Sequence, residues 1–104
     1  MKTFIIEATD TFLQGRQYGD DGSPVVLIHG ACVDADFWND CAAHLSKHHR
    51  VFTYDRRGYG RNEETDDHST HIQAEDACRM IRLIDEHCFV MGHSAGYLIA
   101  MALA

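Results

Sequence analysis

The chain has few basic side chains, no long apolar run and no closely spaced pair of cysteines, and each shortage excludes a class of protein. Nine Lys and Arg residues stand against 16 Asp and Glu residues, so the formal charge is −7 at pH 7. A charge of this sign repels phosphate backbones, and the one adjacent basic pair is Arg56-Arg57. No apolar stretch approaches the ~20 residues of a membrane-spanning helix. We therefore expect neither nucleic acid nor a membrane as a partner.

The four cysteines lie too far apart in the sequence for a metal or redox pair of the Cys-x-x-Cys kind. The amino terminus reaches the charged residue Glu7 before an apolar segment of the length found in signal peptides can form. Both observations favour a reduced, cytoplasmic setting, in which free cysteines are buried as small apolar side chains. No metal and no cofactor is expected.

The composition that remains is that of a globular chain, with 45% hydrophobic and 24% charged residues among 104. Short apolar runs alternate with amphipathic stretches, a pattern typical of strands alternating with helices. Strands are predicted at 3–7, 11–18, 25–28, 51–54 and 88–91, and helices at 34–45, 70–86 and 97–104. Asp34 or Asp36 is expected to cap the first helix, and Thr70 with Gln73 to form a capping box at the second.

A nucleophile motif stands between the last predicted strand and the last predicted helix. Residues 92–96 read Gly-His-Ser-Ala-Gly, which fits the pattern Gly-x-Ser-x-Gly. A serine at a sharp strand-to-helix turn projects its hydroxyl above the sheet, and Gly92 and Gly96 let neighbouring backbone approach without a Cβ clash. The amino end of the following helix directs free N–H groups at the same place. Ser94 is therefore the candidate nucleophile.

Two further motifs precede this one. His29-Gly30-Ala31 follows the strand predicted at 25–28, and residues 55–60 read Asp-Arg-Arg-Gly-Tyr-Gly after the strand predicted at 51–54. In this order the three motifs resemble the oxyanion turn, the Asp-x-Arg-Gly-x-Gly loop and the nucleophile elbow of the α/β-hydrolase superfamily, in its serine-nucleophile branch. The resemblance covers nearly the whole chain.

The fold that the resemblance implies is α/β. It is a partial α/β-hydrolase fold, a three-layer sandwich in which helices flank a mostly parallel sheet of about five strands. Residues 1–104 would form a single partial domain that lacks the carboxy-terminal half and breaks off shortly after the elbow.

The resemblance also implies roles for individual residues. Ser94 would attack the substrate, and the backbone N–H groups of Ala31 and Ala95 would form the oxyanion hole. Cys32 is the alternative to Ala31, because the extra glycines of the His-Gly-Gly-Gly type are absent. The supporting residues of the site would be His29, Gly30, Asp55, Gly92 and Gly96.

Several side chains near these motifs are expected to have structural roles. We expect His29 and Asp55 to brace their loops, and the side chain of His93 to point away from that of Ser94. Phe37 and Trp38 are expected to pack the helix at 34–45 against the core rather than to form the wall of a substrate pocket.

The base that would activate Ser94 is missing from its expected place. In the superfamily the nucleophile is followed along the chain by an acid and then by a histidine, and residues 95–104 contain neither. A pairing of His29 with Asp55 upstream is the formal alternative. We expect the chain alone to be close to inactive and the strand at 88–91 to be an open apolar edge that a complementing carboxy-terminal segment would cover.

The function implied by the resemblance is that of a serine hydrolase that cleaves an ester, thioester or amide of a small-molecule acyl substrate through an acyl-enzyme. Serine at the elbow argues against the haloalkane dehalogenases and epoxide hydrolases, which place aspartate there. Peroxidase-like, lyase and carbon–carbon hydrolase relatives remain. The alternatives are a non-catalytic binding protein of the same fold, and a truncated product or subunit that needs a second chain.

Overall fold

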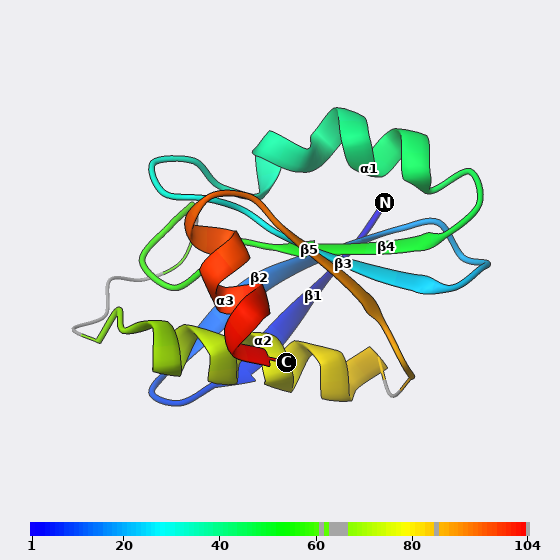
Figure 1. Ribbon diagram of the computed structural model, residues 1–104. Coiled ribbons are helices and arrows are strands. Elements are labelled where there is room, and N and C mark those ends of the chain that lie inside the picture. Colours follow the sequence, from blue (N-terminus) through cyan, green and yellow to red (C-terminus); the bar gives the residue numbers. More distant parts are fainter. Residues whose placement is uncertain (61, 63–66, 85, 104) are drawn as a thin grey trace.

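The computed structural model describes residues 1–60, 62, 67–84 and 86–103 (Figure 1). All five predicted strands are confirmed to within one residue at each end. The elements in chain order are β1 Lys2–Ala8, β2 Thr11–Tyr18, β3 Pro24–Ile28, η1 Ala35–Trp38, α1 Asn39–Leu45, β4 Arg50–Tyr54, α2 Thr70–Ile84, β5 Phe89–Gly92 and α3 Ala95–Leu103.

The five strands form one sheet in the order β1-β2-β4-β3-β5. Strands β4, β3 and β5 are parallel, whereas β2 pairs antiparallel with both β1 and β4, so the sheet is mixed. Figure 1 shows α1 on one face and α2 and α3 on the other, which is the three-layer arrangement of the partial α/β-hydrolase fold. No helix in the described ranges is both long and apolar enough to cross a membrane.

The core lies on both faces of β3, and all five residues of this strand are buried because helices cover both sides. Successive side chains alternate between the faces. Val26 and Ile28 pack in the apolar cluster under α2 and α3, whereas Val25 and Leu27 pack in the cluster under α1 together with Trp38. The expected packing role of Trp38 is thereby confirmed.

The helix predicted at 34–45 is wrong in its first turn. Residues 35–38 form a 3₁₀ turn, and the α-helix begins at Asn39. The Asp34 carboxylate accepts a hydrogen bond from the N–H of Asp36 at 2.9 Å, so Asp34 is the cap. The Asp55 carboxylate, from beyond β4, accepts from the N–H of Ala35 at 2.8 Å. This contact between distant segments holds the turn, and a local pattern does not reveal it.

The capping box predicted at Thr70 and Gln73 is also wrong. Ser69 caps α2, because its hydroxyl accepts from the N–H of Ile72 at 3.3 Å and its carbonyl from the N–H of Gln73 at 3.1 Å. The Gln73 side chain turns away from the helix end. It donates to the His68 carbonyl at 2.8 Å and accepts from the buried Arg56 guanidinium.

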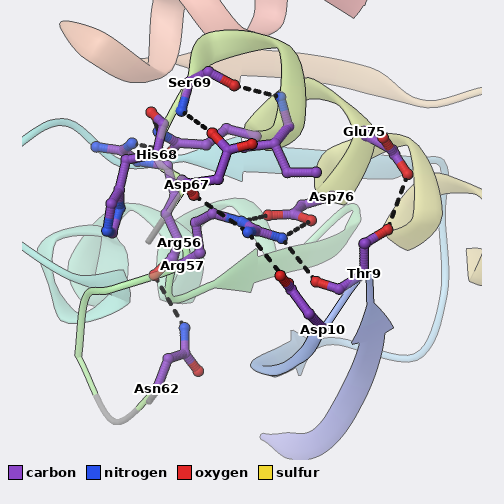
Figure 2. Close-up of polar contacts among 12 residues, drawn as sticks. Thr9, Asp10, Arg56, Arg57, Asn62, Asp67, His68, Ser69, Glu75 and Asp76 are labelled. Atoms are coloured by element: carbon purple, nitrogen blue, oxygen red, sulfur yellow. Dashed lines mark hydrogen bonds and ion pairs between the residues drawn. The ribbon is translucent and has the colours of Figure 1, made fainter. Parts of the chain in front are cut away.

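Arg57 ties the loop after β4 to α2 and to the turn between β1 and β2 (Figure 2). Its guanidinium, fully buried, donates to both carboxylate oxygens of Asp76, at 2.7 and 3.0 Å. Further bonds at 3.3 Å reach the carbonyls of Thr9 and Asp67. The hydrogen bonds to Asp76 raise the pKa of Arg57 above its ordinary value, whereas burial raises the pKa of Asp76. The Arg57 guanidinium therefore links α2, the segment that precedes α2, and the turn between β1 and β2.

Candidate active site

Ser94 occupies the bend between β5 and α3, outside both elements. Its side chain is exposed, and its φ of 57° lies in the left-handed region that residues other than glycine rarely adopt. The N–H of Gly96 bonds the His93 carbonyl and the N–H of Tyr97 bonds the Ser94 carbonyl, both at 2.9 Å. The chain therefore turns sharply at the serine, as the motif predicts.

The two glycines of the elbow are required by close backbone contacts. A Cβ at Gly92 would lie 2.2 Å from the Gly96 carbonyl oxygen, and a Cβ at Gly96 would lie 2.2 Å from the carbonyl oxygen of Ile28. Both separations are far below any real contact. The elbow is thereby packed against the end of β3, and Gly92 and Gly96 have the spatial role expected of them.

The backbone of Ser94 should store strain that a glycine would release. We expect Ser94→Gly to raise the free energy of unfolding by about 1 kcal/mol relative to Ser94→Ala, because only the alanine retains a Cβ at positive φ. Urea unfolding of the two variants measures this difference. Ala102→Gly, in the exposed surface of α3, should have the opposite sign and lower stability. Equal stability of Ser94→Gly and Ser94→Ala would contradict the strained elbow.

The turn after β3 packs directly against the elbow. A Cβ at Gly30 would lie 2.9 Å from the His93 carbonyl oxygen and 3.1 Å from the Cβ of Ser94. Ala31 follows at once and is exposed. Ala95 is the first residue of α3, where a helix leaves its N–H groups without an acceptor inside the helix. Residues 30, 31, 94 and 95 therefore come together at one place.

His29 is a fully buried brace. Its Nε2 accepts a hydrogen bond from the N–H of Arg56 at 2.9 Å, and its Nδ1 lies 2.7 Å from the Gly30 carbonyl oxygen. An accepting Nε2 requires the proton to sit on Nδ1, which then donates to Gly30. Burial lowers the pKa of His29, so the ring is neutral. Since both ring nitrogens bond backbone groups, the alternative pairing of His29 with Asp55 is not formed.

The neutral state of His29 predicts a loss of stability in acid. An unfolded histidine takes up a proton near pH 6.5, whereas the folded ring resists protonation until a lower pH. The unfolded chain therefore binds more protons, and stability present above pH 6.5 is lost as the pH falls. We expect His29→Gln, whose amide does not titrate, to show a shallower fall in unfolding free energy between pH 7 and pH 5 than the parent. Parallel slopes would refute the assignment.

Asp55 holds the start of η1 from a buried position. Besides its bond to the N–H of Ala35, its carboxylate lies against Gly60, where an added Cβ would meet the Asp55 carboxyl carbon at 2.4 Å. Gly60 has a φ of 59°. The bracing role expected of Asp55 agrees with these contacts, which join the segment after β3 to the segment after β4.

Phe37 departs from its expected packing role. Its side chain is 45% exposed, and its ring stacks on that of His93 with centroids 4.7 Å apart. The spacing of four residues through Phe37, Cys41 and Leu45 places Phe37 on the buried face only if the α-helix is continuous. The 3₁₀ turn advances about 120° a residue instead of 100°, so Phe37 leaves the buried stripe. Only the structure shows that this ring lies beside the elbow.

A serine exposed at a strand-to-helix bend, above parallel strands with helices on both faces, defines the α/β-hydrolase class of protein. The chain belongs to the alpha/beta hydrolase family, whose family model matches residues 25–104.

Two relatives are similar to the chain in sequence, and one solved structure is similar to it in fold. An uncharacterized hydrolase, YraK, of Bacillus subtilis (strain 168) is 31% identical over 91 residues, which are 84% of this chain and 34% of the relative. A non-heme chloroperoxidase of Streptomyces lividans is 38% identical over 79 residues, 73% of this chain and 29% of the relative. A thioesterase domain from the curacin biosynthetic pathway has a TM-score of 0.92 at 24% identity, covering 100% of this chain and 41% of that one.

The chain thus spans about a third of the length of the curated relatives that it matches. The two relatives are named for different activities, a hydrolase and a chloroperoxidase, and the likeness to the thioesterase domain establishes the fold alone.

Proposed function

We propose that Ser94 is the nucleophile of a serine hydrolase that cleaves an ester, thioester or amide of a small acyl substrate. The observation that carries the proposal is the exposed hydroxyl at the strained bend, with the turn after β3 packed against it. The Ser94 oxygen bonds the substrate carbonyl carbon while its proton passes to a base. The leaving group then takes that proton and departs, and water releases the acid from the acyl-enzyme.

The oxyanion hole of this proposal consists of the N–H groups of Ala31 and Ala95. Ala95 follows the nucleophile at the amino end of α3, where the helix dipole favours negative charge. Ala31 follows Gly30, where an added Cβ would lie 3.1 Å from the Cβ of Ser94. Cys32, the alternative donor, is in the left-handed region with a φ of 65°. We favour Ala31 because it is nearer along the chain to the contact with the elbow.

A carboxy-terminal segment would supply the acid and the histidine that act on Ser94. The support is the free edge of the sheet at β5, where Phe89 is 68% and Met91 48% exposed. Apolar strand edges of this kind pair with a further strand. Residues 1–104 are then one part of a larger domain, and this part alone lacks the base on which turnover depends. The four free cysteines support a cytoplasmic setting, but the expectation that they are buried is wrong, because Cys32 is exposed and the other three are half-buried.

Complementation tests the proposed function. The chain is produced in fusion with the part of YraK that follows the matched region, and a second fusion uses the Streptomyces relative. We expect both fusions to hydrolyse a nitrophenyl ester at least ~10³-fold faster than the unfused chain, because on this proposal the added segment supplies the base for Ser94. Folded fusions no faster than the unfused chain would overturn the proposal. Circular dichroism establishes that each fusion is folded.

A further inference from the structure

A hollow of about 550 Å³ lies between the segments that follow β3 and β4. Cys32, Val33 and Phe37 line it from the first segment, and Tyr59 lines it from the second. The hollow adjoins the elbow, because the Phe37 ring stacks on His93, the residue before Ser94. It also adjoins the turn at Gly30, since Cys32 is two residues further along the chain. A substrate held at Ser94 would therefore have this space beside it.

The two aromatic rings of the hollow are fixed from behind. The Phe37 ring meets the buried ring of Trp38 edge to face, with centroids 5.1 Å apart. The Tyr59 ring meets the buried His29 ring at 5.3 Å, and the Arg56 guanidinium lies 4.6 Å from its centroid. Rings held in this way offer apolar contact area with little loss of side-chain freedom on binding. The two rings therefore offer a fixed surface against which an apolar group can pack.

Asp34 is the source of negative charge in the hollow. Asp34 and Asp36 line it, and no Lys or Arg is among the described residues that do. Arg16 pairs with Asp36 at 2.5 Å from a largely buried position and offsets the charge of that carboxylate. The Asp34 carboxylate bonds the N–H of Asp36, a contact that leaves its charge in place. The formal charge of the whole chain, with these carboxylates included, is −7. A ligand that carries a carboxylate is therefore repelled, whereas an uncharged ligand is not.

We propose that this hollow binds the uncharged apolar part, aryl or alkyl, of the acyl substrate. Phe37 is the specificity-determining residue, and Asp34 rejects anionic substrates. The inference rests on the proposed function for the identity of its ligand as a substrate. Binding in the hollow needs no reaction at Ser94. An experiment can therefore contradict the proposed binding without contradicting the proposed hydrolysis, and the reverse.

Titration of the isotopically labelled chain by NMR tests the proposal with benzyl alcohol and benzoate, which share a ring and differ in charge. Benzyl alcohol should shift the amide signals of Val33, Phe37 and Tyr59, and benzoate should bind at least ~5-fold more weakly. Phe37→Ala should weaken benzyl alcohol binding about tenfold, and Phe37→Leu less. Phe12→Ala, a side chain 60% exposed on β2 and outside the hollow, is the matched control and should change nothing.

The charge is tested by Asp34→Asn, which keeps an acceptor for the N–H of Asp36. We expect this variant to bring benzoate within about twofold of benzyl alcohol. Asp40→Asn makes the same charge change on the exposed surface of α1 and should leave the gap intact. Equal affinity of the parent for both probes, or equal effects of Phe37→Ala and Phe12→Ala, would overturn the proposal. Ser94→Ala should bind benzyl alcohol as the parent does, so loss of the nucleophile leaves this result unaffected.

Discussion

Ser94→Ala is expected to lower the kcat/KM of the complemented enzyme for a nitrophenyl ester by ~10⁴-fold or more, since the acyl-enzyme cannot form without the hydroxyl. What remains is the rate that the oxyanion hole and substrate binding support without a nucleophile. Initial rates under substrate-limited conditions measure the loss. Ser23→Ala, an exposed serine in the turn before β3, is the matched control and should retain activity within about twofold. A Ser94→Ala enzyme that retained a tenth of the parent rate would contradict a nucleophilic role.

Asp76→Asn is expected to have the largest effect on stability. The substitution leaves the exposed carboxylate of Asp10, 3.7 Å away, as the remaining acidic partner of the buried Arg57 guanidinium. The Asn amide can replace only one of the two accepting oxygens of Asp76. Breaking a buried ion pair on one side costs about 3–5 kcal/mol, which urea unfolding measures directly.

The neighbouring acid supplies the control for this prediction. Glu75→Gln makes the same chemical change one residue away, where the carboxylate is partly exposed and pairs with Arg79 at 3.3 Å. Its effect should be much smaller, because exposed pairs are screened by water. The double variant Arg57→Met with Asp76→Leu should recover part of the stability lost in Asp76→Asn, because it removes both charges from the core. If Asp76→Asn cost no more than Glu75→Gln, Arg57 would not depend on this partner.

The strands could be predicted from the sequence because their signal is local. Val25 to Ile28 form a short continuous apolar run, and such a run has few alternatives to a strand buried on both faces. The elbow was predictable for a related reason. The backbone contacts at Gly92 and Gly96 leave no space for a Cβ, and glycine at both positions is visible as a spacing.

The errors arose where distant segments decide local structure. Asp55 bonds the N–H of Ala35 across 20 residues of chain, and the turn that it stabilises moves Phe37 from the core to the surface. The Gln73 side chain accepts a hydrogen bond from the Arg56 guanidinium, 17 residues away, instead of bonding the end of its own helix. Helix periodicity and capping patterns depend only on residues that are close in sequence, so they do not predict either of these long-range contacts.

The candidate site, too, is only partly predictable from the sequence. The positions of Ser94, Gly30 and Ala95 follow from motifs at the ends of neighbouring parallel strands, which meet at one edge of the sheet. The hollow beside them depends on ring contacts among Phe37, Trp38 and His93, which come from separate segments. These contacts are a property of the packed molecule.

Covalent labelling tests the central claim most directly. The complemented enzyme is treated with a fluorophosphonate, digested with trypsin and analysed by mass spectrometry. We predict a single adduct on Ser94, in the peptide that begins at Leu83, and its absence from Ser94→Ala. An enzyme that hydrolyses the ester while Ser94 stays unlabelled, or that is labelled at another residue, would contradict the claim that this serine is the nucleophile.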